Sequence, residues 1–375
     1  MLSLSDFDYN LPKNLIATKP HEPRDQCKLL VYDCVTKEIK HTRFDKILNF
    51  LNKGDVLVLN NTKVIPARLI GRRITETGEV GRKFEVLLLK ESPFSSLFSK
   101  EGEKGDLWET LIDGKGRRPG LKINFGKDFI GEIISWKGEG VWLMKFNKTG
   151  KDFWNLVFKL GKMPLPPYIK QKKDLSQESS AAKALEDRNK KWYQTVYAQH
   201  LGSVAAPTAG LHFTKRLLDK IKKKNVRVEY VTLHIGLGTF APVKAEDIRK
   251  HKMHPEYVVI SSQTARALNQ AKKEGRRIVA VGTSTARALE AAAKNNKIKP
   301  FSGEVKIFIY SPYKFKFVDA LITNFHLPRS TLLMMISAFL GDSPKKSVEL
   351  IKKIYQIVIE KKYKFYSYGD AMLIF

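Results

Sequence analysis

Five short apolar segments follow one another between residues 65 and 150, and no helical pattern separates them. Strands joined by glycine-bearing turns at such spacing are typical of a small antiparallel barrel or sandwich. The rest of the chain alternates strand and helix patterns, which is typical of an α/β domain. The sequence therefore predicts a mixed-sheet α/β main domain, formed by 1–64 and 151–375 and interrupted by a small antiparallel β-barrel domain at 65–150.

Hydrophobic periodicity sets the expected elements. In the barrel we expect strands at Phe84–Leu89, Leu107–Ile112, Leu121–Phe125, Phe129–Trp136 and Val141–Phe146. In the main domain we expect strands at Leu29–Tyr32, Asp55–Leu59, Val226–Thr232, Arg277–Val281, Lys306–Tyr310 and Asp319–Thr323. We expect helices at Asp45–Leu51, Asp152–Leu160, Leu217–Ile221, from a cap at Ser262 to Gly275, at Ala286–Lys294 and at Ser330–Leu340. The polar segment Gln171–Lys191 is expected to be a linker or a solvent-exposed helix.

The charge balance points to a polyanionic partner. The chain has 67 Lys and Arg against 38 Asp and Glu, a formal net charge of +29. A general bias toward Lys would explain part of this excess without any partner. Arginine pairs are more informative, because the guanidinium group binds phosphate in a bidentate way. The candidate nucleic-acid contacts are Arg72, Arg73, Lys115, Arg117 and Arg118, although the basic loop at 113–120, taken alone, favours a solvated hairpin over a phosphate contact.

Cysteine usage and the apolar runs indicate the compartment. Cys27 and Cys34 are the only cysteines, and their spacing suggests neither a disulfide framework nor a metal site. The N-terminus lacks the pattern of a signal peptide. The longest apolar run, Leu332–Leu340, is about half of the ~20 residues that a membrane helix needs. We expect a soluble protein of the reducing cytoplasm, without membrane contact.

Two glycine-bearing loops flank the helix and strand between residues 202 and 242. Ser203–His212 precedes the helix, and Gly236–Phe240 follows the strand. Loops with so little side-chain bulk let a ligand approach the backbone. Gly236, Gly238 and Ala241 match the letters of a dinucleotide fingerprint, but no long helix follows, so we reject a Rossmann dehydrogenase.

Three further polar segments have both a functional and an ordinary structural interpretation. Gly282–Thr285 leads from a strand into a helix, so it can hold a carboxylate, phosphate or ribose, or its hydroxyls can simply cap the helix. Arg287 in the same helix favours a functional role. His251–Glu256 resembles a metal motif, but Pro255 breaks any helical face and no third ligand follows. Asn324–Ser330 places polar groups beside an apolar helix, which favours function.

Seven segments together closely resemble one family. They are Asn60–Arg68 (NNTKVIPAR), Met163–Ile169 (MPLPPYI), Tyr193–Tyr197 (YQTVY), Ala205–Thr214 (AAPTAGLHFT), Thr232–Phe240 (TLHIGLGTF), Ile322–Pro328 (ITNFHLP) and Tyr368–Met372 (YGDAM). These segments, which span nearly the whole chain, resemble those of the S-adenosylmethionine:tRNA ribosyltransferase-isomerases of queuosine biosynthesis. The sequence departs from the family pattern at Asn61, usually Asp, at 113–114 and 282–287, and in a long 171–191 segment.

This resemblance implies a reaction and its partners. The ribosyl part of S-adenosylmethionine would be transferred to 7-aminomethyl-7-deazaguanine in the wobble position of tRNA, giving epoxyqueuosine-tRNA, adenine and methionine. S-adenosylmethionine would then be a consumed substrate, and no metal or other cofactor is expected. The resemblance also implies that the α/β domain formed by 1–64 and 151–375 is the catalytic domain and is interrupted by the β-barrel, and we expect a monomer.

The chemistry needs proton carriers and a donor pocket. The sulfonium acidifies the neighbouring C5′–H, adenine must gain a proton, and the aminomethyl group must lose one. The candidate carriers are His212, His234, His326 and Asp370, because His titrates near neutral pH and burial can tune Asp. The candidate donor-binding residues are Thr208, Gly210, Gly236, Gly238, Thr239, Phe240, Gly282, Thr283, Arg287, Asn324 and Arg329. Arg287 or Arg329 would bind the methionine carboxylate, and Phe240 would face the sulfonium.

Two alternatives belong to other classes. A non-catalytic tRNA-binding protein would use the barrel and the net charge but show no turnover. A tRNA methyltransferase would use the same donor but release S-adenosylhomocysteine. Product analysis separates all three.

Overall fold

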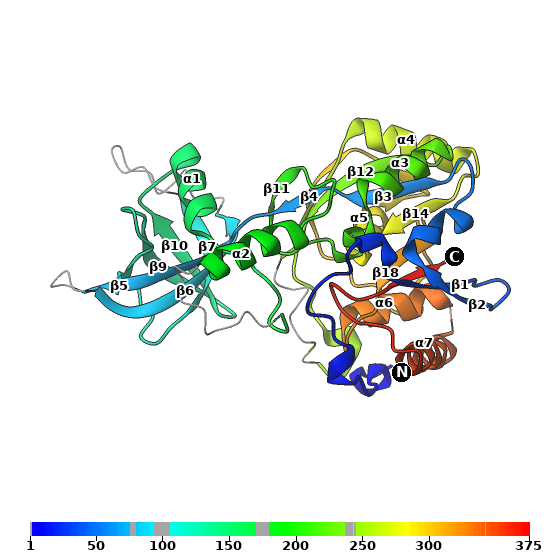
Figure 1. The fold of residues 1–375 in the computed structure, drawn as a ribbon, viewed down its shortest axis with the longest axis horizontal. Helices are drawn as coiled ribbons and strands as arrows, with labels where there is room; N and C mark the ends of the chain where they lie inside the picture. Colours follow the sequence, from blue (N-terminus) through cyan, green and yellow to red (C-terminus); the bar gives the residue numbers. More distant parts are fainter. Residues whose placement is uncertain are drawn as a thin grey trace.

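The computed structural model describes residues 2–75, 80–92, 106–169, 180–236, 243, 245–341 and 343–375. A closed barrel lies at one end of the long axis of the molecule, and a nine-stranded sheet with its helices lies at the other (Figure 1). Helix α2 (Ser180–Trp192) runs between them in this view, so the expected solvent-exposed helix exists over part of the 171–191 segment.

The large sheet is mixed. Its order is β17-β13-β12-β3-β14-β18-β19-β1-β2. The bounds are β1 Lys28–Tyr32, β2 Ile39–Arg43, β3 Val56–Asn60, β12 Arg227–His234, β13 Glu256–Ile260, β14 Ile278–Val281, β17 Phe301–Val305, β18 Ala320–Asn324 and β19 Ala371–Ile374. The central strands β12, β3, β14 and β18 are parallel, and β19 pairs antiparallel with β18 and parallel with β1. The predicted mixed-sheet α/β fold with a barrel is confirmed.

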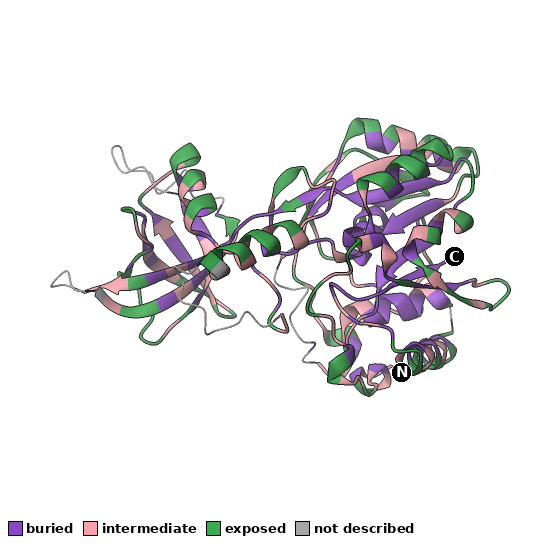
Figure 2. Cartoon of the chain, in the orientation of Figure 1, coloured by how far each residue is buried: buried purple, intermediate pink, exposed green. Residues whose placement is uncertain are grey.

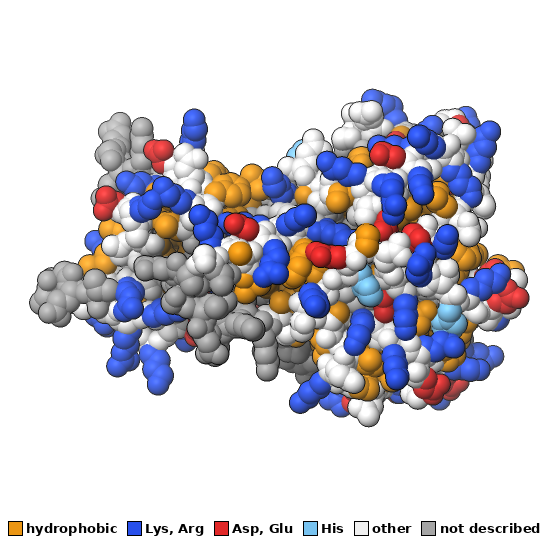
Figure 3. All heavy atoms as spheres, in the orientation of Figure 1, with side chains coloured by type: hydrophobic (Ala, Val, Ile, Leu, Met, Phe, Trp, Pro, Cys, Tyr) orange, Lys and Arg blue, Asp and Glu red, His pale blue; other side chains and the backbone are white. Residues whose placement is uncertain are grey.

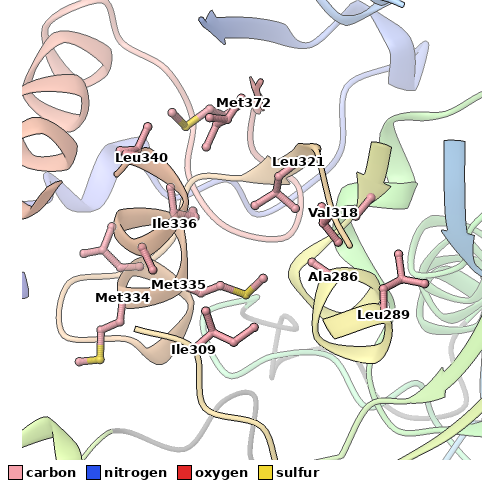
Figure 4. Close-up of a cluster of buried hydrophobic side chains, with 14 of the residues drawn as sticks. Ala286, Leu289, Ile309, Val318, Leu321, Met334, Met335, Ile336, Leu340 and Met372 are labelled. Atoms are coloured by element: carbon pink, nitrogen blue, oxygen red, sulfur yellow. The ribbon is translucent and has the colours of Figure 1, made fainter. Parts of the chain in front are cut away.

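Both faces of this sheet are covered, as its continuous apolar strands require. In β3, Val56 and Val58 pack in one hydrophobic cluster, and Leu57 and Leu59 pack in the other. The helices on the first face are α4 (Ser262–Lys273), α5 (Thr283–Ala292), α6 (Thr331–Leu340) and α7 (Pro344–Glu360). The second face is covered by η4 (Phe44–Phe50) and α3 (Lys215–Lys223). Figure 2 shows the buried strands between helices whose outer sides are exposed, and Figure 4 shows side chains of α5 and α6 around Leu321 of β18.

The barrel closes in the order β10-β7-β6-β5-β8-β9. Its strands are β5 Arg68–Ile74, β6 Val80–Glu91, β7 Leu107–Asp113, β8 Lys122–Asn124, β9 Ile130–Gly138 and β10 Val141–Phe146. Helix α1 (Gly150–Leu160) contributes Phe153 and Val157 to the barrel core, where Phe153 meets Phe129 and Phe146 edge to face. This packing connects α1 with the barrel, and the division of the chain at 64/65 and 150/151 stays a prediction.

Short elements complete the fold. The remaining strands are β4 Thr62–Val64, paired with β11 His200–Ser203, and β15 Ala293–Lys294, paired with β16 Lys297–Ile298. The remaining 3-10 turns are η1 Leu4–Phe7, η2 Lys13–Leu15, η3 Arg24–Gln26, η5 Thr208–His212 and η7 Ile248–Lys250. Within the described ranges, no helix is both long and apolar enough to cross a membrane.

Several expected boundaries were wrong. The strand expected at 306–310 lies instead at Phe301–Val305, because pairing with β13 sets it there. The hydroxyl of Ser261, not that of Ser262, caps α4 by accepting the N–H of Thr264. The helix expected at 45–51 is a 3-10 segment.

Candidate active site

The carboxyl ends of the parallel strands bring distant segments to one edge of the sheet. Because β12, β3, β14 and β18 run in the same direction, the residues at or just beyond their ends lie along that edge. Strands β19 and β1 begin at the same edge, since Asn324 pairs with Ala371 and Leu29 also pairs with Ala371. The residues gathered there include Cys27, Asn60, His234, Gly282, Asn324 and Asp370. In open α/β sheets, ligands bind at this edge.

His212 lies buried in η5, and both of its ring nitrogens have partners. Its Nδ1 lies 3.2 Å from the Cys27 sulfur, and its Nε2 lies 3.1 Å from the amide nitrogen of Asn324. Burial lowers the pKa of His212 to about 4, although Asp370 partly opposes this shift. His212 is therefore neutral near pH 7, and its hydrogen-bonding capacity is used within the protein.

His234, at the end of β12, has one free ring nitrogen. Its Nδ1 lies 2.8 Å from the Thr62 hydroxyl, which in turn donates to the His200 carbonyl at 3.5 Å. The 2.8 Å bond can run in either direction, depending on the tautomer of the ring, and Nε2 has no hydrogen-bond partner in the described part of the chain. Burial, and then His200, lower the pKa of His234 below its ordinary value. A half-buried neutral imidazole with an open nitrogen can exchange a proton there, and it accepts one in the tautomer whose own proton is on Nδ1.

The imidazole of His234 packs against Gly202. A Cβ at this position would lie only 2.8–3.0 Å from three atoms of the His234 ring, so the ring packs directly on the glycine. The backbone of Gly202 has φ of +142°, which other residues rarely adopt.

His326 and Asp370 are held by the segments around them. The Nε2 of His326 lies 2.9 Å from the Thr323 hydroxyl, and burial lowers the pKa of His326 to about 3. Asp370 is 1% exposed, and its carboxylate accepts the backbone N–H groups of Lys28 and Lys364 at 2.7 and 2.6 Å. Asp370 therefore connects β1 with the segment that precedes β19. It also lies 3.4 Å from the Nε2 atom of His21.

Helix α5 begins at the same edge without a side-chain cap. Gly282 precedes it with φ of +89°, and the hydroxyl of Thr285 donates to the Val281 carbonyl instead of capping the helix. The backbone N–H groups of Thr283, Ser284 and Thr285 have no acceptor among the described residues. Free N–H groups at a helix N-terminus attract anions.

The two arginines expected to bind a carboxylate are already paired. Arg287 is buried and forms an ion pair with Glu256 of β13 at 2.5 Å. Arg329 is exposed and donates twice to the Asp8 carboxylate, at 2.9 and 2.6 Å.

The expected loop residues have different surroundings. Thr208 donates its hydroxyl to Asn324 at 3.2 Å. Gly210 has no room for a side chain, because a Cβ there would lie 2.0 Å from the Tyr197 hydroxyl oxygen, whereas Gly236 faces open space. The predictions for Gly238, Thr239 and Phe240 fall outside the described residues.

The expected nucleic-acid contacts lie on the barrel. Arg72 and Arg73 belong to β5, and the loop after β7 carries exposed Lys115, Arg117 and Arg118. This loop shares one end of the barrel with the turn between β9 and β10, because Leu111 pairs with Val141. Figure 3 shows Lys and Arg side chains spread over both the barrel and the α/β unit.

Four supporting residues were not predicted from the sequence: Cys27, Thr62, Gly202 and Tyr366, whose carbonyl accepts the amide of Asn324 at 3.1 Å. Each acts through a contact with a residue far along the chain; Cys27 and His212, for example, are 185 positions apart. One local signal was available, because Thr62 follows an apolar strand that ends in two asparagines.

The fold and this edge define an α/β protein with an inserted barrel, whose site can bind an anionic group and accept a proton. A family model described as queuosine biosynthesis protein matches residues 4–374. The chain therefore belongs to this queuosine biosynthesis family.

Relatives of known name agree with this family. The chain is 46% identical to the S-adenosylmethionine:tRNA ribosyltransferase-isomerase of Caldanaerobacter subterraneus, over 99% of each chain. It is 45% identical to the protein of the same name from Clostridioides difficile, over 98% of each chain. The crystal structure of the S-adenosylmethionine tRNA ribosyltransferase from Thermotoga maritima is 32% identical, with a TM-score of 0.52, and the match covers 99% of this chain and 100% of that one.

Proposed function

We propose that this chain is an S-adenosylmethionine:tRNA ribosyltransferase-isomerase. It transfers and isomerises the ribosyl part of S-adenosylmethionine onto 7-aminomethyl-7-deazaguanine in the wobble position of tRNA. The products are epoxyqueuosine-tRNA, adenine and methionine. The observation that carries this proposal is the 45–46% identity, over 98–99% of both chains, to relatives that bear this name.

The first turn of α5 is the proposed binding site for the methionine carboxylate. Its free N–H groups and the helix dipole both favour an anion. The Thr208–Gly210 loop borders this corner, since a Cβ on Gly282 would lie 3.7 Å from that of Ala209. Backbone N–H groups are better candidates here than Arg287 and Arg329, because both guanidinium groups already bind protein carboxylates.

His234 is the proposed base for the C5′–H of the donor. The neighbouring sulfonium acidifies this hydrogen, and the open Nε2 can take it as a proton. Burial keeps the ring neutral near pH 7, which a base requires. His326 is also neutral, but a pKa near 3 makes it a weak base, so it suits a hydrogen-bonding role better than proton transfer.

The barrel is the proposed tRNA-binding unit. Its Arg72, Arg73, Lys115, Arg117 and Arg118, together with the net charge of +29, suit the phosphate backbone. We further propose that the enzyme acts as a cytoplasmic monomer. It needs no metal or other cofactor, because S-adenosylmethionine supplies the ribosyl group and is consumed.

Product analysis tests this function. The purified chain is incubated with S-adenosylmethionine and either tRNA that carries 7-aminomethyl-7-deazaguanine or the same tRNA with guanine. We expect adenine and methionine in equal amounts, only with the modified tRNA. S-adenosylhomocysteine would instead identify a methyltransferase, and tRNA binding without any product would identify a binding protein.

A further inference from the structure

A chain of hydrogen bonds runs through the buried side of the site, from Cys27 to Thr208. The Cys27 sulfur lies 3.2 Å from Nδ1 of His212, and Nε2 of His212 lies 3.1 Å from Nδ2 of Asn324. Oδ1 of Asn324 accepts the Thr208 hydroxyl at 3.2 Å. Cys27 is fully buried, and His212 and Asn324 are 4% and 2% exposed. Thr208 is half-buried, so it is the end of the chain nearest solvent.

The direction of each bond in this chain can be read from the contact between Asn324 and the backbone carbonyl of Tyr366. A carbonyl only accepts, so the Asn324 atom 3.1 Å from it must be the amide nitrogen. The second hydrogen of this nitrogen points to Nε2 of His212, which must therefore be unprotonated. A neutral His212 then carries its proton on Nδ1 and donates it to the sulfur of Cys27.

Tyr366 is itself firmly held in this arrangement. It has φ of +75°, an uncommon conformation for a bulky residue. Its N–H donates to the Phe325 carbonyl at 2.9 Å, and its carbonyl also accepts the N–H of Gly369 at 2.9 Å. Such a conformation persists only where the surroundings over-determine it, and such positions concentrate at functional sites.

These directions set the polarity of Thr208. Its hydroxyl proton is committed to Oδ1 of Asn324, so Oγ1 can offer only lone pairs to a ligand. Thr208 is also next to Ala209, which borders the first turn of α5. An α-amino acid carries an anionic acceptor and a cationic donor on adjacent atoms, and this corner presents free N–H groups beside a hydroxyl acceptor.

We infer that Thr208 Oγ1 binds the α-ammonium group of the methionyl part of S-adenosylmethionine, and that Cys27, His212 and Asn324 are positioning residues that hold Thr208 as an acceptor. This inference rests on the proposed function for the identity of the donor. It assigns to His212 a positioning role instead of proton transfer.

Two ligands and two substitutions test the contact at Thr208. S-adenosylmethionine carries the amino-acid group, whereas 5′-methylthioadenosine lacks it and keeps the adenosine. Thr208→Val has nearly the same shape without the acceptor, and Thr208→Ser keeps the acceptor. Calorimetric titration of the full-length protein with each ligand gives both dissociation constants.

We expect Thr208→Val to weaken S-adenosylmethionine binding roughly 10-fold or more, the range for a hydrogen bond to a charged group. Binding of 5′-methylthioadenosine should stay unchanged, and Thr208→Ser should bind both ligands like the wild type. An equal loss for both ligands, or no loss for either, would overturn the inference. The readout is binding, so it is independent of whether adenine is released, and a failure here is distinguishable from a failure of the proposed function.

The positioning residues are tested by the ratio of the same two affinities. Cys27→Ala removes the acceptor for the Nδ1 proton, and Cys27→Ser restores one. We expect Cys27→Ala and Asn324→Ala to lower the preference for S-adenosylmethionine over 5′-methylthioadenosine, and Cys27→Ser to keep it. A purely structural role would weaken both ligands in parallel, and this result would refute the positioning role.

Discussion

Substitution of Gly202 by alanine displaces the proposed base, His234, and leaves its own side chain unchanged. The new methyl group would lie 2.8–3.0 Å from Cε1, Nε2 and Nδ1 of His234. An ordinary contact is about 3.5–4.0 Å, so the imidazole must retreat by roughly 0.5–1 Å. A misplacement of about 1 Å can cost on the order of 100-fold in rate. Because the expected displacement is roughly 0.5–1 Å, we expect Gly202→Ala to lower kcat by about 10- to 100-fold.

The assay is steady-state release of adenine with both substrates saturating, which gives kcat. Alanine at a positive φ is strained in itself, so a matched control is needed. Gly126→Ala provides it, because Gly126 has φ of +98° and open space around it, in the turn between β8 and β9 of the barrel. We expect the control to change the melting temperature but not kcat. Equal kcat values for Gly202→Ala and the wild type would refute the packing argument and the role of His234 with it.

Three further predictions concern stability and tRNA binding. The unfolded chain binds a proton on His212 below its ordinary pKa of 6.5, whereas the folded protein does so only near 4. Urea unfolding should therefore show stability falling as the pH drops through this window, with His212 alone contributing up to about 3 kcal/mol at roughly 1.4 kcal/mol per pH unit, and a flat profile would contradict this. Glu290 is 1% exposed and its carboxylate accepts four hydrogen bonds. Glu290→Gln should therefore lower the unfolding free energy by about 2–4 kcal/mol, and a loss below roughly 1 kcal/mol would show that these bonds contribute little to stability. The double variant Arg117→Ala, Arg118→Ala should weaken tRNA binding and leave S-adenosylmethionine binding unchanged. The slope of the logarithm of the tRNA-binding constant against the logarithm of salt concentration should fall by about one to two, and an unchanged slope would show that this loop does not contact tRNA.

Hydrophobic periodicity predicted the architecture because strands in a buried sheet must be apolar on both faces. Val56–Asn60 and Ile278–Val281 were recognisable for this reason. Strand Arg68–Ile74 was missed, because its charged side chains hide the alternation in a barrel wall that faces solvent on one side. The misplaced strand at 306–310 shows the limit of local pattern, since only the ladder with β13 identifies Phe301–Val305.

The site was predictable as a set of loops but not as a set of roles. Four of the expected positions, His234, Gly282, Asn324 and Asp370, lie along the carboxyl edge because the central strands share one direction. Their hydrogen-bond partners depend on tertiary contacts that no local pattern encodes. His212 looked like a proton carrier in a small-residue loop, yet Cys27 and Asn324 occupy both of its ring nitrogens.

The most direct test of the account is adenine release by a His234→Gln variant. Glutamine keeps a polar side chain but cannot take the C5′ proton at neutral pH. We predict a fall of roughly 100-fold or more in the single-turnover rate, the usual contribution of a general base, with S-adenosylmethionine and tRNA affinities unchanged. A rate within about threefold of the wild type, far inside that range, would contradict the assignment of this edge as the catalytic site.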